Sequence, residues 1–399
     1  MTVIHVLSLG LDETLFMDES AARGNAASRQ RRYAERLRRL DIVVFTRRDP
    51  GLRARELAPS VGAYPTRSRH SLFYVPDALR LSERIRREHG PIDVVVTQDP
   101  FLTGLAGYLC KRRWGIGLNV QLFSSFFDNP QWLSERPVNR LFHILGRWII
   151  RAADTVRVES ATEKQHLVAL GLLEERVWVI PLLYNFERFT QADGTHIRVR
   201  YLGGSYSKIV LFVGRLSPEK DIPTLLQAVP LLVQAHPGVR VVIVGRGRED
   251  AALRQMAAEL GLGERVVFAG GVSNDELPAY FQACDVFVLP SIYEGIPTVL
   301  VEAAASGKPV VSTRTRNVDD VVVHEQTGLI VPIRDPGALS EALAHILSDP
   351  AQARQMGQAG RELVRARFSP EQVLADLAAM WEATALHSRN LSQTPARKE

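Results

Sequence analysis

The chain has 399 residues, 46% of them hydrophobic and 23% charged, with a formal net charge of +5 at pH 7; these values indicate a globular protein too long for one hydrophobic core. No apolar run reaches the roughly 18 residues of a membrane span, and the first residues lack the basic and apolar regions of a signal peptide. Cys110 and Cys284 fit neither a disulfide framework nor zinc spacing, which is typical of a protein in a reducing cytoplasm.

The positive charge lies in the first half of the chain. Residues 1–190 contain 28 Lys and Arg against 21 Asp and Glu, a net of +7, and the remainder carries a net of −2. Such a half attracts phosphates, anionic lipid or nucleic acid, or it forms a solvated arginine-rich surface, which we favour. The basic helix predicted over residues 29–40 lacks the interleaved aromatic residues of single-strand binders, so no nucleic-acid partner is expected.

Short β-branched segments alternate with helical patterns through residues 1–190. Several of the predicted strands are apolar almost throughout, which favours a parallel sheet buried on both faces. The strands are predicted at 2–9, 41–47, 92–98, 118–123, 154–160 and 176–182, and helices at 79–89 and 101–115. This rhythm predicts a first open α/β domain.

The alternation restarts in a second domain, predicted over residues 208–368. Its strands are predicted at 208–214, 240–245, 265–271, 285–291, 308–314 and 327–333, with helices at 223–238, 248–261, 273–284 and 336–349. We expect a linker at 191–207, a helix at 369–388 that crosses back to the first domain, and a disordered polar tail at 389–399. The fold class is therefore α/β, with two Rossmann-like doubly wound domains facing a cleft in which ligands bind near the carboxyl ends of the strands.

Two cations follow the first strand of the second domain. In GRLSPEKD, Arg215 offers a planar fork and Lys220 a point charge, so together they suit a diphosphate. The alternative is two exposed cations on a turn.

The segment SIYEGIPTVLVEAAASGKPVV, residues 291–311, places a glutamate on each side of a predicted helix start. Pro297 suits the first helical position and Gly307 the stop, which leaves free N–H groups from Gly295 to Thr298 as an anion site. Carboxylates are good acceptors for vicinal hydroxyls. Glu294 and Glu302 therefore predict a nucleotide sugar, with one polyol on each side of its diphosphate. The alternative is that Glu294 compensates the helix dipole and Glu302 faces solvent.

Two glycine-rich turns follow neighbouring strands. VGRGRED, residues 244–250, lacks the third glycine of a dinucleotide fingerprint, so we interpret it as a tight turn near a nucleotide and not as NAD binding. Gly271 and Val272 end another strand, where the backbone can approach the edge of a base closely.

Together, GRLSPEKD, VVIVGRGRE, the run from VFAGG to SGKPVV and GLIVP resemble the donor domain of retaining glycosyltransferases of family 4, which have the two-domain GT-B fold. The resemblance is strong over residues 205–370 and looser before them. It implies transfer of a hexosyl unit from a nucleoside diphosphate sugar to an acceptor hydroxyl of a sugar, glycolipid or small molecule, with retention of configuration. The leaving phosphate takes the acceptor proton, and neither a cofactor nor a metal is expected.

The resemblance also assigns residues. It implies catalytic roles for Arg215, Lys220 and Glu294. Glu294 holds the sugar, Glu302 the ribose, and the backbone at Gly271 and Val272 meets the base. The predicted donor site is completed by Gly295, Ile296, Pro297 and Thr298, and the acceptor-side candidates are Gly10, Asp99, Phe123, Ser124 and Ser125.

One departure from the family pattern concerns proton transfer. Related sequences usually carry His where Phe123 stands and often Asp where Ser125 stands. Either the donor phosphate acts as the base, or Asp99 or Ser124 substitutes, or the chain binds without turnover. Asp99 is otherwise an ordinary turn former or helix cap. The alternatives to a transferase are a non-catalytic nucleotide-sugar-binding partner protein and a nucleotide-sugar epimerase.

Residues 129–154 mix aromatic and aliphatic side chains with arginines, among them Trp148 and Arg147. This composition suits peripheral contact with an anionic membrane, at the inner face for a cytoplasmic protein. It also suits a helix packed in the core of the domain, which is the interpretation we favour.

Overall fold

The computed structural model describes residues 4–17 and 26–393 and divides the chain into two compact units. The N-terminal unit comprises Met1–Leu183 with Pro370–Glu399, and the C-terminal unit is Tyr184–Ser369. The expected linker at 191–207 is instead part of the C-terminal unit. It contains α8 (Thr195–Tyr201), which follows α7 (Glu187–Gln191) and buries Ile197 and Tyr201.

The sheet of the N-terminal unit is parallel except at one edge, where β3 runs antiparallel to β4. Its strand order is β3-β4-β2-β1-β5-β6-β7-β8. The strands are β1 (His5–Gly10), β2 (Arg39–Val44), β3 (Arg55–Ala58), β4 (Val61–Pro65), β5 (Val94–Thr97), β6 (Gly117–Leu122), β7 (Thr155–Val158) and β8 (Val177–Val179). Chain order reverses between β1 and β5, so the loops after these two strands lie side by side at the carboxyl edge.

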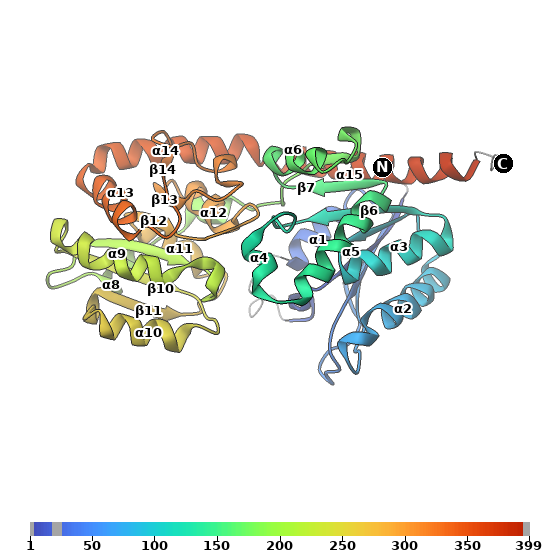
Figure 1. Cartoon of the computed structure of the whole chain (residues 1–399), viewed down its shortest axis with the longest axis horizontal. Helices are drawn as coiled ribbons and strands as arrows, with labels where there is room; N and C mark the ends of the chain where they lie inside the picture. The colour runs from blue at the N-terminus through green and yellow to red at the C-terminus, as the bar shows by residue number, and fades with distance from the viewer. Residues whose placement is uncertain (1–3, 18–25, 394–399) are drawn as a thin grey trace. The chain divides into compact units, whose positions relative to one another are not determined.

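Helices cover both faces of this sheet, as the alternation of buried side chains requires. On one face, Leu7 and Val95 belong to a core that also contains residues of α2, α3 and α5, which lie next to one another in Figure 1. On the other face, Val6 and Val94 pack with residues of α1 and α15. The helices of this unit are α1 (Ala26–Ala34), α2 (Tyr74–His89), α3 (Leu102–Trp114), α4 (Pro130–Glu135), α5 (Val138–Ala152), α6 (Ala161–Ala169) and α15 (Pro370–Gln393).

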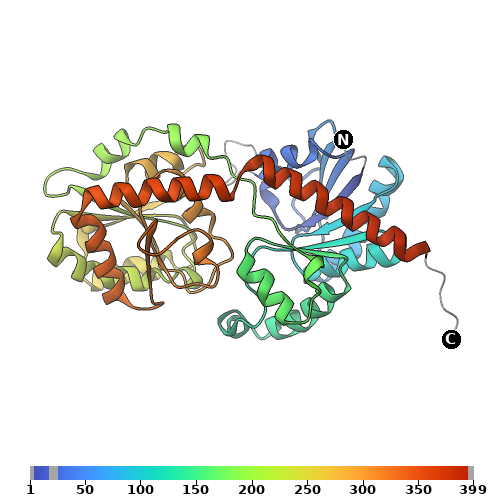
Figure 2. The same ribbon diagram turned by 90° about the horizontal axis from the view of Figure 1, so that it is seen from above.

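Helix α15 belongs to the N-terminal unit although it ends the described chain (Figure 2). Its backbone lies so close to β6 that a Cβ on Gly117 would stand 2.5 Å from the carbonyl oxygen of Thr384. The hydroxyls of Thr155 and Thr384 are 2.7 Å apart. Residues 389–393, predicted as part of a disordered tail, continue this helix, and residues 394–399 lie outside the described part.

The sheet of the C-terminal unit is wholly parallel within the described residues, in the order β11-β10-β9-β12-β13-β14. Its strands are β9 (Lys208–Val213), β10 (Val239–Val244), β11 (Val266–Gly270), β12 (Val286–Leu289), β13 (Val310–Thr313) and β14 (Gly328–Val331). The further helices are α9 (Ile222–Ala235), α10 (Asp250–Glu259), α11 (Leu277–Ala283), α12 (Thr298–Ala305), α13 (Pro336–Ser348) and α14 (Pro350–Arg367). Here chain order reverses between β9 and β12, which are hydrogen-bonded neighbours.

A buried polar network joins the beginnings of β1 and β2 to the C-terminal end of α2. The Asp41 carboxylate, 0% exposed, accepts hydrogen bonds from His5 Nε2 at 2.8 Å, His89 Nδ1 at 3.0 Å and Arg39 Nε at 2.9 Å. Burial alone raises the pKa of Asp41, but the His5 and Arg39 hydrogen bonds outweigh burial and lower that pKa to about 2. The charged carboxylate therefore stabilises the fold above its ordinary pKa of 3.8, and this contribution is lost as the pH falls through about 2.

Replacing Asp41 with Asn should mimic the protonated carboxyl. At pH 7, Asp41→Asn is expected to lower the free energy of unfolding of the N-terminal unit by about 2 kcal/mol, the value of its pKa shift. The difference in the free energy of unfolding between the variant and wild type should disappear between pH 4 and pH 2, as urea unfolding followed by circular dichroism would show. Asp77→Asn removes an ion pair with the exposed Arg80 and a negative charge in the first turn of α2; its free energy of unfolding should stay within about 1 kcal/mol of wild type at every pH. A gap that persists at pH 2 contradicts this account.

Candidate functional site

The residues predicted to bind a diphosphate and a sugar meet at the carboxyl edge of the C-terminal sheet. The loop after β9 carries Arg215 and Lys220, and the loop after β12 carries Glu294. Because β9 and β12 are neighbours at the reversal of strand order, these loops come together. A backbone hydrogen bond of 2.8 Å from Ile292 N–H to the carbonyl of Glu219 joins them directly.

Lys220 and Glu294 form an ion pair between these loops. Each side chain is only 12% exposed. The Glu294 carboxylate also accepts a hydrogen bond of 2.7 Å from Ser291 Oγ, and its backbone carbonyl accepts one of 3.4 Å from Asn317 Nδ2. Ser291 and Asn317 were missed from the sequence. Ser291 stands within the motif that contains Glu294, whereas nothing marked Asn317.

Arg215 projects from the same loop into solvent. Its side chain is 81% exposed and lies 3.4 Å from the carboxylate of Glu219. Burial raises the pKa of Glu219, but the hydrogen bond from Ser217 and the nearby Arg215 and Lys220 lower it overall. One guanidinium nitrogen of Arg215 is therefore paired with a neighbouring carboxylate, while the side chain as a whole is exposed to solvent, where an anion can reach it.

The turn predicted at 244–250 supports this loop through two glycines. A Cβ on Gly245 would lie 1.8 Å from the Gly214 carbonyl oxygen, and one on Gly247 would lie 2.1 Å from that of Leu216. Both neighbours are backbone atoms, which cannot rotate away. The glycines therefore let the β10 turn pack directly against the loop that carries Arg215 and Lys220.

Helix α12 begins at Thr298, with Pro297 at the N-cap position instead of the predicted first helical position. Glu302 is the fifth residue of α12 and is half-buried. Burial raises the pKa of Glu302 to about 7, although the positive charge of Arg188 acts in the opposite direction. Glu294 and Glu302 thus occupy different environments, one paired with a cation and one partly desolvated.

The loop after β11 carries Gly271 and Val272, both half-buried. Because β11 is the edge strand, this loop is separated from the β9 loop by that of β10. Arg188 of α7 donates a hydrogen bond to the backbone carbonyl of Asn274 and also influences Glu302. Arg188 therefore connects the predicted base and ribose positions, a role that its irregular sequence context did not indicate.

In the N-terminal unit, Gly10 is the last residue of β1, and Asp99 follows the adjacent strand β5. Asp99 is 9% exposed, and burial raises its pKa. Its carboxylate accepts a hydrogen bond of 2.7 Å from Phe101 N–H, just before α3. This geometry is that of a turn former, the first of the two ordinary roles considered for Asp99. The second role, a helix cap, does not apply, because Phe101 holds the N-cap position of α3 and no side chain caps that helix.

Phe123, Ser124 and Ser125 follow β6 at the same edge. The guanidinium of Arg157, which is fully buried, lies over the Phe123 ring at 5.4 Å from its centroid. Ser125 donates a hydrogen bond of 2.8 Å to a Glu163 carboxylate oxygen and is 2% exposed, so it anchors the loop to α6. Arg157 was not singled out from the sequence, because nothing in it distinguishes a buried arginine from a surface one.

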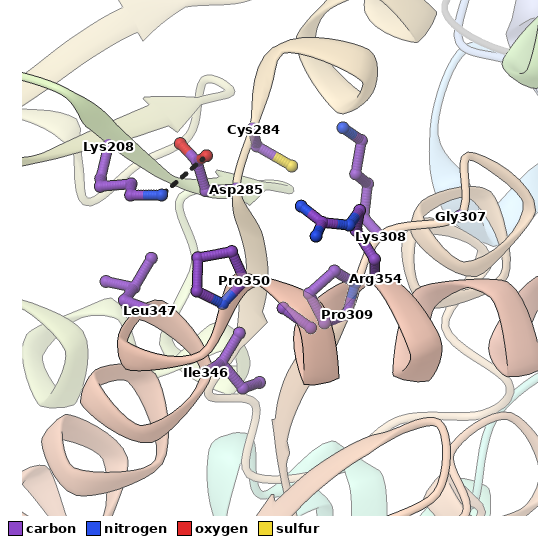
Figure 3. Close-up of a pocket in the computed structure, with 11 residues that line it drawn as sticks. Lys208, Cys284, Asp285, Gly307, Lys308, Pro309, Ile346, Leu347, Pro350 and Arg354 are labelled. Atoms are coloured by element: carbon purple, nitrogen blue, oxygen red, sulfur yellow. Dashed lines mark ion pairs between the residues drawn. The ribbon is translucent and has the colours of Figure 1, made fainter.

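Away from the loops that carry Lys220 and Glu294, a cavity of about 200 Å³ is lined by Lys208, Asp285 and Lys308, which stand at the amino ends of β9, β12 and β13 (Figure 3). It is therefore at the opposite edge of the sheet from Lys220 and Glu294.

Within residues 4–17 and 26–393, no group of three His, Cys, Asp or Glu side chains is arranged to hold a metal ion.

Residues 197–363 match the family described as Glycosyl transferases group 1, and residues 24–182 match a Glycosyl transferase 4-like domain. A D-inositol 3-phosphate glycosyltransferase from Geodermatophilus obscurus is 30% identical over 78% of this chain and 71% of its own length. A GDP-mannose-dependent alpha-(1-6)-phosphatidylinositol monomannoside mannosyltransferase from Mycobacterium tuberculosis is 36% identical over 47% of this chain. That match spans half of the mannosyltransferase's length.

Solved structures show the same architecture. Sucrose-phosphate synthase from Thermosynechococcus elongatus has a TM-score of 0.78 and 25% identity, covering 98% of both chains. HepE from Anabaena, solved in complex with UDP, has a TM-score of 0.75 and 20% identity over 94% of this chain and 99% of its own. The predicted fold class, two α/β domains of the GT-B type, is confirmed.

The environment of Glu302 predicts a pH dependence of stability. Because its pKa is raised from 4.5 to about 7, its contribution to folding is complete below pH 4.5 and is lost as the pH rises through 7. Glu302→Gln should therefore stabilise the C-terminal unit at pH 8 by about 1–2 kcal/mol, discounted for partial exposure, and change little at pH 4.5. Urea unfolding at both pH values measures this. The exposed Glu341→Gln should stay within about 0.5 kcal/mol, and a destabilised Glu302→Gln at pH 8 would contradict the assignment.

Proposed function

Because the chain belongs to the group 1 glycosyltransferases, we propose that it transfers a hexosyl unit from a nucleoside diphosphate sugar to an acceptor hydroxyl, with retention of configuration. The observation that carries this proposal is the convergence of Lys220 and Glu294 at the reversal of strand order in the C-terminal unit. Ligands of doubly wound sheets bind at this position.

The donor would occupy the carboxyl edge of that sheet. Its diphosphate takes charge-assisted hydrogen bonds from Lys220 and from the exposed fork of Arg215, and its oxygens face the N–H groups that precede α12. Glu294 accepts from hydroxyls of the transferred sugar, and Glu302 accepts from the ribose. The backbone at Gly271 and Val272 meets the base.

Transfer breaks the bond between the sugar C1 and the diphosphate oxygen and forms a bond from C1 to the acceptor oxygen on the same face. The acceptor proton passes to the leaving phosphate oxygen. Lys220 and Arg215 stabilise the negative charge that develops there. We propose that these two cations supply the stabilisation and that no metal ion is needed.

The relatives suggest where a substrate search should begin. One is named for GDP-mannose and a phosphatidylinositol monomannoside, another for D-inositol 3-phosphate, and HepE was solved with UDP-glucose. The donor panel should therefore include both guanosine and uridine diphosphate sugars. The acceptor panel should include inositol phosphate and phosphatidylinositol mannosides.

Substituting the paired residues tests the donor site. Lys220→Ala and Glu294→Gln should each lower the rate of nucleoside diphosphate release about 10²- to 10³-fold, because each removes a preorganised contact to a reacting group. Release is measured by a coupled assay, and circular dichroism checks the fold. Glu341→Gln, in the exposed part of α13, is the control. Normal turnover in either site variant contradicts the assignment, and donor binding without release from any donor and acceptor pair contradicts the transferase activity.

Substituting Phe123 tests how the proton moves. If the leaving phosphate accepts it, Phe123→His should give no gain in kcat, and Phe123→Leu should isolate the effect of losing the ring over Arg157. General-base assistance raises rates roughly 10²- to 10⁴-fold. A comparable rise in Phe123→His, with a new ionisation near pH 6–7 in the rate profile, would show that the lack of an imidazole at position 123 limits the wild-type rate and would contradict this account.

A further inference from the structure

The outer face of α5 exposes large apolar side chains to solvent. Leu141 is 67% exposed, Ile144 68%, Trp148 46% and Val138 41%. They recur at intervals of three and four residues and therefore share one side of the helix. Scattered single apolar residues are normal on a surface, whereas a contiguous row of them marks an interaction site.

This row is separate from the face by which α5 packs on its own unit. Ile149 is fully buried and Ile150 is 2% exposed, and both belong to the core shared with α2 and α3. The interpretation of residues 129–154 as a core helix therefore accounts for one face of α5 only. On the second apolar face, Trp148 contacts a ring of α3, whereas Leu141 and Ile144 stay largely exposed in the N-terminal unit.

The neighbouring helix α3 extends the exposed apolar surface. The rings of Tyr108 and Trp148 meet edge to face with their centroids 4.5 Å apart, and Leu109, next in sequence, is 37% exposed. We define the α5 surface as Val138, Leu141, Ile144 and Trp148 of α5 with Leu109 of α3. Helices α3 and α5 lie next to each other in Figure 1.

Basic side chains border the α5 surface. Arg140 and Arg151 are exposed on α5, beside the apolar row, and Arg112 is exposed one turn beyond Leu109 on α3. No acidic residue occurs between Val138 and Ala152. An apolar stripe with Trp and a flanking row of arginines is the pattern of a helix that lies in the interface of an anionic bilayer.

We propose that the α5 surface is a peripheral docking site for an anionic lipid membrane. Its apolar row enters the boundary between headgroups and acyl chains, and its arginines contact lipid phosphates. Charge complementarity favours a lipid surface over an apolar protein partner, because a row of arginines needs a dense array of anions opposite it. The proposed contact is peripheral, and no described helix is long and apolar enough to span a bilayer. Docking does not depend on the proposed transfer reaction.

Co-sedimentation of the full chain with lipid vesicles tests the proposal. At low salt, the protein should pellet with vesicles of equimolar phosphatidylcholine and phosphatidylglycerol, stay in the supernatant with phosphatidylcholine alone, and dissociate as salt is added. Leu141→Glu/Ile144→Glu should reduce the partition coefficient more than about tenfold. Arg112→Gln/Arg140→Gln should reduce it about 25-fold, since each basic side chain near an anionic surface contributes about fivefold.

The control variant replaces two exposed apolar residues with glutamate in the C-terminal unit. Val199→Glu/Leu231→Glu alters residues that are 74% and 46% exposed in the C-terminal unit and should bind like wild type. In wild type, brominated lipid should quench part of the tryptophan fluorescence, and Trp148→Phe should lose that part. Circular dichroism shows whether each variant folds.

Three results would overturn the proposal. Wild type could fail to pellet with anionic vesicles at low salt, or Leu141→Glu/Ile144→Glu could bind as wild type does. Alternatively, sedimentation velocity could show that wild type is a dimer and that the same double variant is a monomer, while wild type does not bind vesicles. That last result would assign the α5 surface to a second copy of the chain.

Discussion

The ion pair between Lys220 and Glu294 holds together two loops that come from strands separated by more than 70 residues of sequence. Both side chains are largely buried, and a charge in such a place is tolerated only beside its partner. The pair forms because β9 and β12 are neighbours at the point where strand order reverses, and because Gly245 and Gly247 allow the β10 turn to support the β9 loop. The groups proposed to contact the donor are therefore also groups that maintain the local structure, so their geometry is set before a ligand arrives.

The two glutamates of this region illustrate how burial gives identical side chains different properties. Glu294 lies against an ammonium group, and Ser291 adds a hydrogen bond to its carboxylate. Glu302 is partly desolvated in α12, so its pKa rises to about 7. Glu302 gains full acceptor character when its proton leaves, and the sequence spacing of eight residues gave no sign of this difference.

Much of the fold could be predicted from hydrophobic patterns, because the inner strands of a parallel sheet are buried on both faces and read as apolar runs. The hairpin of β3 and β4 was missed, since Arg55–Ala58 is short and polar at an edge. Helix α14 was also missed, although Asp349 and Pro350 form a clear start signal for it. At the candidate site, the motifs predicted Lys220 and Glu294, which the structure places in one ion pair. Arg188 and Arg157 make contacts with residues distant in sequence, which no local pattern encodes.

The return of α15 to the N-terminal unit affects the order in which the chain can fold during synthesis. Residues 184–369 form a contiguous unit, which can close once it has left the ribosome. The N-terminal unit, most of which is synthesised first, lacks part of one core until Leu377, Met380 and Trp381 have been added. While the C-terminal unit is being translated, one apolar face of the N-terminal sheet is therefore not yet covered by α15. A chain released from the ribosome after residue 369 would carry a complete C-terminal unit and an N-terminal unit that lacks this helix.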